Sequence, residues 1–252
     1  MTVLDSTSYL ARIGFTGPTN PNLDTLKRLH LAHLHTVPFE NLDISLGREI
    51  VCNEERFFHK IVNLRRGGFC YELNGAFAGL LRAVGFRVSL LSARVSREDG
   101  STSPDFDHLA LRVDLDEPWL ADVGFGDSFL QPLLLKPDFE QEQDNGRFRM
   151  VAVGSVRIVQ RQVQDGSWKS QYQFTLLPRQ LSDFASRCRF QQTSPDSHFT
   201  RQRICTLPAP DGRITLSDLK LIRTTGQARK ERMLKDEAEW RSTLEQYFGV
   251  KL

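Results

Sequence analysis

The chain has 252 residues, of which 40% are apolar, and its 33 Lys and Arg residues nearly balance its 31 Asp and Glu residues. This composition is typical of a folded globular protein and argues against an intrinsically disordered chain. The net charge of +2 provides no field that would attract nucleic acid or an anionic membrane surface, so we expect neither as a partner.

Helix signals dominate the first third of the chain. Asn22 and Asn53 are typical helix caps, Pro38 is a typical stop, and apolar residues recur at helical spacing between such signals. One of these helices would place Arg65 and Arg66 in its last turn, where the helix dipole favours positive charge. The predicted helices span residues 6–13, 23–37, 54–66 and 70–84.

After residue 86 the pattern changes to β-rich segments separated by turn sequences. The predicted strands span residues 87–95, 108–115, 119–123, 150–163 and 171–177. The polar segment 136–146 is expected to be a surface loop between strands. Beyond residue 181 we expect a turn capped by Ser182, a polar loop through Pro195, strands near Ile204 and Ile214, and a final helix over 228–247. Helices followed by strands favour the α+β class over an alternating parallel sheet.

No segment approaches the roughly 18 apolar residues of a membrane-spanning helix, and the start of the sequence lacks the regions of a signal peptide. We therefore expect a cytoplasmic protein whose four cysteines are reduced thiols. His30, His33 and His35 form the pattern H-x-x-H-x-H near a helix end, with no carboxylate or cysteine at ligand spacing. We interpret them as surface residues and expect no metal site.

Cys70 is the residue with the clearest potential for chemistry, because it follows Gly67-Gly68 and begins a predicted helix. Unpaired N–H groups and the positive end of the helix dipole stabilise a thiolate there. A thiolate nucleophile needs a base, and the base needs an orienting group. His108 and Asp122 lie 14 positions apart on two predicted neighbouring strands, which could place them side by side. From spacing alone, three unrelated structural residues remain the alternative interpretation.

Six blocks of the sequence stand out together. They are HTVPFENLDI at 35–44, RGGFCYELNGAF at 66–77, DHLAL at 107–111, ADVGFG at 121–126, TSPDSHF at 193–199 and YFG at 247–249. In this order and from end to end, the blocks resemble the arylamine N-acetyltransferases. The resemblance covers essentially the whole chain.

The resemblance implies an α+β fold around a cysteine-protease-like catalytic core. Residues 1–85 would form a helical bundle carrying Cys70, residues 86–190 a β-barrel-like domain carrying His108 and Asp122, and residues 191–252 an α/β lid. It also implies that Cys70, His108 and Asp122 are the catalytic triad. The implied reaction moves the acetyl group of acetyl-CoA, a cosubstrate, to the nitrogen of an arylamine or arylhydrazine through an acetyl-cysteine, in a ping-pong scheme.

The binding residues are less directly indicated. We expect Phe39, Phe125, Phe129 and Phe199 to form the pocket for the aromatic acceptor, because flat apolar rings suit an aromatic amine. In the resemblance, Gly126 and Ser128 border the acyl-donor cleft and are candidates for coenzyme contacts. Ten basic residues against four acidic ones between positions 187 and 232 would suit phosphate groups. The backbone N–H groups of Phe69 and Cys70 are candidates for an oxyanion hole.

The chain departs from the family in two ways. It is short for the group, and Asp127-Ser128-Phe129 replaces the usual small, glycine-rich continuation of the DVGFG block, so we expect a different acceptor selectivity. The same triad would serve a hydrolase or amidase of the cysteine-protease or transglutaminase type, or an amide synthase of aromatic natural products. A non-catalytic protein that binds an aromatic metabolite is disfavoured, because binding would not need the three residues together.

Overall fold

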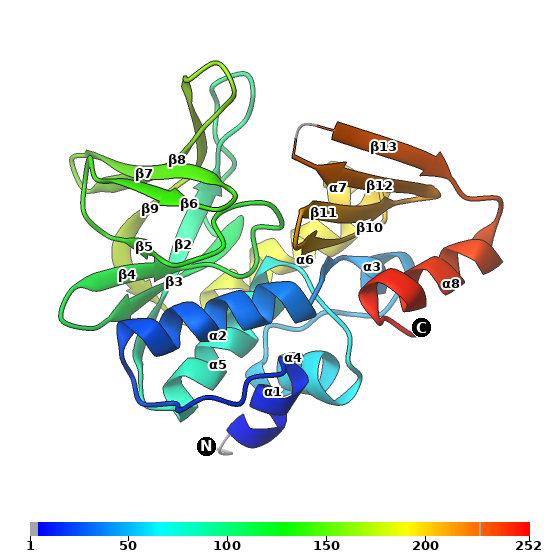
Figure 1. Cartoon of the computed structure of the whole chain (residues 1–252), viewed down its shortest axis with the longest axis horizontal. Coiled ribbons are helices and arrows are strands. Elements are labelled where there is room, and N and C mark those ends of the chain that lie inside the picture. Colours follow the sequence, from blue (N-terminus) through cyan, green and yellow to red (C-terminus); the bar gives the residue numbers. More distant parts are fainter. Residues whose placement is uncertain (1–4, 227) are drawn as a thin grey trace.

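Two antiparallel β-sheets and a set of helices make up the part of the chain that the computed structural model describes, residues 5–226 and 228–252 (Figure 1). In the view of Figure 1 the two sheets stand side by side above the N-terminal helices. The α-helices are α1 (Ser6–Arg12), α2 (Leu23–Thr36), α3 (Leu42–Ser45), α4 (Glu54–Phe58), α5 (Cys70–Ala83), α6 (Ala185–Thr193), α7 (His198–Arg201) and α8 (Glu237–Phe248), with a π-helix η1 (His59–Asn63) and a 3₁₀-helix η2 (Leu181–Phe184).

The larger sheet has eight strands in the order β5-β4-β3-β2-β9-β8-β7-β6 and curls into a nearly closed barrel. Glutamine side chains of β6 bridge the two ends of the sheet, because Gln141 accepts a hydrogen bond from the Leu134 N–H at 2.7 Å and Gln143 accepts one from the Leu130 N–H at 2.9 Å. The strands are β2 (Arg87–Val95), β3 (His108–Asp114), β4 (Pro118–Ala121), β5 (Leu133–Leu134), β6 (Glu140–Gln143), β7 (Gly146–Val153), β8 (Val156–Gln162) and β9 (Trp168–Arg179).

The smaller sheet has five strands in the order β1-β10-β11-β12-β13. Its first strand comes from the N-terminal part of the chain, so β1 ties that part to the C-terminal strands. Trp240, Leu244 and Phe248 of α8 pack with buried residues of this sheet. The strands are β1 (Phe39–Glu40), β10 (Ile204–Ala209), β11 (Gly212–Ser217), β12 (Lys220–Thr225) and β13 (Ala228–Met233).

Helix α5 is the central element of the fold. Its residues from Cys70 to Leu81 are all buried, so the helix has no solvated face and is surrounded by packing partners. Leu73, Phe77 and Leu80 belong to one core with residues of α1, α2 and β3. The predicted caps are confirmed for two other helices, because the side chains of Asn22 and Asn53 accept hydrogen bonds from N–H groups of the first turn. Packing on all sides buries the start of α5 between the other helices and the barrel.

The helix predicted over 54–66 ends early. Helix α4 spans Glu54–Phe58 and continues only as the π-helix η1, and Arg65 then adopts a left-handed φ of 51°. Arg66 is buried instead of lying in a last helical turn. The early end of the helix is caused by tertiary contacts. Arg66 contacts carboxylates of other elements, and it can reach them only if the chain leaves the helix before residue 66.

Predictions in the β-rich and C-terminal parts need four corrections. Segment 136–146 is not only a loop, because residues 140–143 form β6. The stretch 150–163 is two strands, β7 and β8, that turn at Gly154 with a φ of 58°. The polar stretch before Pro195 contains α6, and residues 228–233 form strand β13 rather than the start of the last helix. Charged residues are compatible with helix and strand alike, so pairing with β12 decides the structure of β13.

The three histidines of the H-x-x-H-x-H pattern are not surface residues. His30 and His33 are completely buried, and His35 is partly buried. The pattern places His30 and His33 on one face of α2, and the structure packs both rings edge-on against Phe77 of α5. The prediction failed because the polarity of imidazole suggests exposure, whereas its ring can pack like an aromatic side chain. Both nitrogens of His30 and Nδ1 of His33 have hydrogen-bond partners inside the protein. None of the helices in the described part of the chain is both long and apolar enough to cross a membrane.

Five charged side chains form a buried cluster beside the start of α5. Lys60 Nζ lies 2.8 Å from Asp43 and 2.8 Å from Glu72, and 3.6 Å from Glu40. Arg66 lies 2.8 Å from Glu40 and 3.0 Å from Asp43. Three carboxylates therefore share two cations inside the protein. Burial raises the pKa of Glu72 to about 7, and attraction to Lys60 opposes this shift.

The raised pKa of Glu72 predicts how stability depends on pH. The folded protein holds this proton more tightly than an unfolded chain, so the stabilisation is complete below the unfolded pKa near 4.5 and is lost as the pH rises through about 7. We expect the free energy of unfolding of the wild type to fall over this range relative to Glu72→Gln, measured by urea denaturation at several pH values. Glu54→Gln, an exposed carboxylate paired with Arg82, is the control. Parallel pH profiles for wild type and Glu72→Gln would contradict the prediction.

Candidate functional site

Cys70 is the first residue of α5 and is 5% exposed. The preceding glycines are required by space, because a Cβ atom on Gly67 would lie 2.0 Å from the Pro38 carbonyl oxygen. Phe69 occupies the N-cap position, and its N–H donates to the Glu72 carboxylate at 3.1 Å. Cys70 Sγ lies 3.9 Å from the carbonyl oxygen of Asp107. The thiol is thus held at a helix N-terminus beside the residue that precedes His108.

His108 and Asp122 form a direct hydrogen bond, with His108 Nε2 2.7 Å from Asp122 Oδ2. His108 begins β3 and Asp122 directly follows β4, and these strands are antiparallel neighbours, with Leu111 opposite Ala121. The neighbouring strands therefore do place the two residues side by side. Because Nε2 is engaged by the carboxylate, Nδ1 is the nitrogen left for a group in the cleft that His108 and Cys70 both line.

Both carboxylate oxygens of Asp122 and its backbone N–H have hydrogen-bond partners. Its Oδ1 accepts hydrogen bonds from Asn74 Nδ2 at 2.8 Å and from the Gly124 N–H at 2.9 Å. Its own N–H donates to His30 Nε2 at 3.1 Å. Burial pushes the pKa of Asp122 upward, but His108 and these donors outweigh burial and hold the pKa below its usual value. Asp122 is therefore an ionised carboxylate in an apolar surrounding.

The surroundings of Cys70 disfavour the charged form of its side chain, whereas those of Asp122 favour it. Burial raises the pKa of Cys70 well above its usual value, and the negative charges of Asp107 and Asp122 act in the same direction. The backbone N–H groups of Leu109 and Tyr71 oppose this shift only in part. A thiolate at this position consequently needs a cation beside it, and His108 is the neighbouring group that can become one by accepting the thiol proton.

A cleft of about 660 Å³ opens in front of the thiol. Its lining comes from the start of α5, the barrel loops, α6, α7 and the five-stranded sheet. Phe39, Phe125 and Phe199 line it, and so does Gly126. The Phe125 ring stands edge-on to His108, with 5.3 Å between ring centroids. Three of the four predicted aromatic residues are therefore brought together in the lining of one cleft.

Phe129 and Ser128 are not among the residues that line this cleft. Phe129 is 1% exposed in the barrel core, where it stacks on His30 at 5.9 Å and stands edge-on to Phe148. Ser128 Oγ donates to Gln171 at 2.6 Å, so its hydroxyl is used within the barrel. The chain turns inward after Gly126, and the barrel core takes up the aromatic ring at position 129.

The oxyanion hole expected from two N–H groups is reduced to one of them. The Phe69 N–H is occupied by the Glu72 carboxylate, which makes it part of the helix cap. The Cys70 N–H is the remaining candidate from that pair. Within residues 5–226 and 228–252, no three His, Cys, Asp or Glu side chains gather in a way that could hold a metal ion.

Sequence reasoning missed several residues that support the site. Asn74 lies one helical turn after Cys70, and an amide on the apolar side of a predicted helix is a signal for a buried hydrogen bond. The Asp107 carboxylate accepts hydrogen bonds from Arg187 and Gln191 of α6, each at 2.5 Å. Tyr172 packs its ring against His108, with 5.0 Å between centroids. These last contacts join distant segments and leave no local signal.

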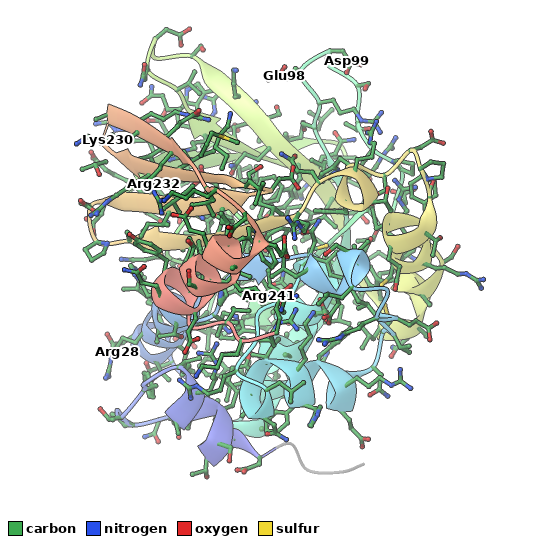
Figure 2. All side chains as sticks on the ribbon, turned by 90° about the vertical axis from the view of Figure 1, so that its right-hand side faces the viewer. Arg28, Glu98, Asp99, Lys230, Arg232 and Arg241 are labelled. Carbon is green, nitrogen blue, oxygen red and sulfur yellow. The ribbon has the colours of Figure 1, made fainter. Side chains whose placement is uncertain are left out.

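The basic residues of the C-terminal part do not all lie in the cleft. Arg187, Arg213 and Arg229 line the cleft. Lys230 and Arg232 are exposed residues of β13 and project at the surface of the molecule (Figure 2). Only part of this positive charge is therefore available to a ligand in the cleft.

The chain is similar to known proteins along most of its length. A family model described as N-acetyltransferase matches residues 22–252. The arylamine N-acetyltransferase of Escherichia coli (strain K12) is 37% identical over 246 residues, which are 96% of this chain and 87% of that protein. The solved structure of the Salmonella typhimurium arylamine N-acetyltransferase has a TM-score of 0.92 and 35% identity, and covers 97% of this chain and 90% of its own. The structure of the Mycobacterium marinum enzyme in complex with CoA has a TM-score of 0.90 and 33% identity, and covers 98% and 93%.

The electrostatics of the thiol predict that its reactivity depends on His108. Without the imidazole, a thiol whose pKa lies above 9 is less than about 1% ionised at pH 7, so His108→Asn should slow alkylation of Cys70 by about a hundred-fold or more. The rate is measured with iodoacetamide and peptide mapping of Cys70. His198→Asn, which changes another histidine lining the cleft, should leave the rate close to that of the wild type. Equal rates in the wild type and His108→Asn would contradict the prediction.

Proposed function

The chain belongs to the arylamine N-acetyltransferase family, and we propose that it moves the acetyl group of acetyl-CoA to the nitrogen of an aromatic amine or hydrazine. In this proposal the acetyl group passes through a thioester on Cys70. The observation that carries the proposal is the His108–Asp122 hydrogen bond beside a cleft that the Cys70 thiol also lines.

In the first half-reaction, Cys70 loses its proton to His108 Nδ1 and attacks the carbonyl carbon of the acetyl thioester. A bond forms between the cysteine sulfur and that carbon, and negative charge develops on the carbonyl oxygen, where the Cys70 N–H is a candidate donor. The bond to the sulfur of coenzyme A then breaks. The departing thiolate of coenzyme A accepts from His108 the proton that came from Cys70, so acetyl-Cys70 and coenzyme A result.

In the second half-reaction, the amine nitrogen attacks the acetyl-cysteine carbonyl. An arylamine is weakly basic and uncharged at neutral pH, so its lone pair is available, whereas an alkylamine is mostly protonated. His108 accepts the proton that the nitrogen loses, and Asp122 stabilises the imidazolium. When the carbon–sulfur bond breaks, His108 returns the proton to the sulfur and N-acetylated product leaves.

The walls of the cleft suit both substrates. Phe39, Phe125 and Phe199 offer aromatic faces to the acceptor. Arg213 and Arg229 on the five-stranded sheet are positioned to attract phosphate groups of the coenzyme, and the open backbone at Gly126 allows close approach of its pantetheine arm. The complex of the Mycobacterium marinum relative with CoA supports a coenzyme site in this fold.

The same proposal assigns a separate role to each of three segments of the chain. Residues 1–85 supply the nucleophile, residues 86–190 supply the base and its carboxylate, and residues 191–252 act as the lid. A cysteine at a helix N-terminus that shares a cleft with a histidine, itself hydrogen-bonded to an aspartate from the adjoining strand end, is the arrangement of a cysteine-protease-like core. The cysteine sulfur is offered an amine in this proposal, rather than water as in a hydrolase.

The acetyl-cysteine predicts a stable intermediate when no acceptor is present. Purified protein mixed with acetyl-CoA should gain the mass of one acetyl group, and peptide mapping should place that group on Cys70. Addition of an aromatic hydrazine should remove it and release N-acetyl product. Cys52→Ser, which removes a partly exposed thiol, is the control for adventitious acetylation.

The same scheme requires parallel lines in double-reciprocal plots when both substrates are varied. Intersecting lines would indicate an obligatory ternary complex and would contradict the acetyl-cysteine. Absence of an acetyl adduct together with rapid alkylation of Cys70 would mean that the thiolate is competent but acetyl-CoA is the wrong donor.

The different positions of two phenylalanines predict different effects on the acceptor. Phe125→Leu removes an aromatic face from the cleft and should raise the KM for an arylamine several-fold with little loss of stability, because the ring is partly exposed. Phe129→Leu leaves a gap in the barrel core and should lower the free energy of unfolding by about 1–3 kcal/mol with a smaller change in KM. Steady-state kinetics and urea denaturation test both. A larger KM effect at position 129 would contradict the assignment.

A further inference from the structure

His30 is a completely buried side chain of α2 that uses both of its ring nitrogens. Nδ1 lies 2.9 Å from the carbonyl oxygen of Leu130, and Nε2 lies 3.1 Å from the backbone nitrogen of Asp122. The ring is held between Phe129, which stacks on it, and Phe77, which meets it edge-on. The side chain is therefore fixed in position and in orientation.

The two partners determine the protonation state of the ring. A carbonyl oxygen only accepts, so Nδ1 must carry the hydrogen, and a backbone N–H only donates, so Nε2 must present its lone pair. Burial lowers the pKa of His30 to about 4, which keeps this neutral form at the pH values where the thiol and imidazole of the site react. The titratable groups that face His30 are Asp122 from the barrel and His33 from its own helix.

The two contacts lie at the two ends of one loop. Residues 122–130 leave β4 at Asp122, run along the cleft at Phe125 and Gly126, and return to the barrel at Leu130. His30 accepts from the first residue of this loop and donates to the last. One imidazole thus clamps the segment that carries both the carboxylate of the site and an aromatic wall of the cleft.

The contact with the Asp122 backbone complements the contacts of its carboxylate. Asn74 Nδ2 and the Gly124 N–H hold Oδ1, and His108 Nε2 holds Oδ2. These bonds orient the side chain, but His30 anchors the main chain from which it extends. If the anchor is lost, the Asp122 N–H becomes a buried donor without an acceptor, and the chain must move to satisfy it.

We propose that His30 is a positioning residue that sets the place of Asp122, and through it the ionisation of the Cys70–His108 pair, by accepting the hydrogen bond of the Asp122 N–H at the start of loop 122–130. The inference rests on the proposed function for the roles of these three residues. His30 itself touches no reacting atom. A shift of Asp122 away from His108 would weaken the stabilisation of the imidazolium, so the thiolate would form only at higher pH.

Two substitutions separate this role from packing. The amide of His30→Gln reaches the place of Nε2, where its oxygen can accept from the Asp122 N–H, whereas the amide of His30→Asn reaches only the place of Nδ1 and can donate to Leu130. Both replace an aromatic ring with an amide. His33→Asn is the matched control, because His33 is buried on the same helix but its Nδ1 lies 3.1 Å from the Tyr9 hydroxyl oxygen.

The test is the pH profile of Cys70 alkylation by iodoacetamide, followed by peptide mapping. For His30→Asn we expect thiolate formation to move up by about one pH unit, which slows alkylation by about ten-fold below the midpoint. His30→Gln and His33→Asn should keep the wild-type midpoint, whatever their loss of stability. A wild-type midpoint in His30→Asn, or an equal shift in His30→Gln, would overturn the proposal.

A measurement on the wild type keeps the proposal testable if the variants do not fold. Long-range ¹H–¹⁵N spectra should show His30 as the Nδ1–H tautomer, without titration between about pH 5 and pH 8. A proton on Nε2, or titration in that range, would overturn the clamp. Neither experiment uses acetyl-CoA, so failure of the clamp and failure of the proposed acetyl transfer are seen separately.

Discussion

A buried thiol that has to ionise is the constraint on which the rest of this structure depends. Burial and two neighbouring carboxylates disfavour the Cys70 thiolate, and the N–H groups of Leu109 and Tyr71 offset only part of that effect. A neighbouring imidazole must therefore accept the proton, and that imidazole needs a carboxylate that stays ionised in an apolar surrounding. The hydrogen bonds from His108, Asn74 and the Gly124 N–H keep Asp122 in that state. Helices α2 and α5 and strands β3 and β4 meet at this point.

The residues that precede Cys70 in the chain are held in place by the buried cluster of five charged side chains. Glu72 caps Phe69 and also contacts Lys60, and Arg66 contacts Glu40, which lies on β1. Because β1 pairs with β10, the cluster connects the start of α5 to the five-stranded sheet that forms the far wall of the cleft. The position of the nucleophile and the position of that wall are thus determined by the same set of buried contacts.

Local sequence signals predicted the elements that are stabilised locally. The caps at Asn22 and Asn53, the amphipathic spacing of α2 and the turn between β3 and β4 all depend on residues a few positions apart, and these elements are where they were expected. Predictions failed where contacts with residues far away in the sequence determine the secondary structure. Strand β13 exists because β12 lies beside it, β6 is held by glutamines that reach the other end of the sheet, and the helix before Arg66 ends because a buried carboxylate attracts that arginine.

The sequence by itself determined the family, through blocks of residues that occur in a characteristic order, and it indicated which three side chains have the chemistry of a nucleophile, a base and a carboxylate. The identity of each of these residues can be recognised from the short sequence motif in which it lies. Only the tertiary structure decided that Phe125 lines the cleft while Phe129 lies in the barrel core, and that His30 and Asn74 contact Asp122. Positions 30, 74 and 122 are far apart in the chain, and no periodicity connects them. Their contacts follow from the way α2 and α5 pack against the barrel, because only folding brings their polar atoms within hydrogen-bonding distance.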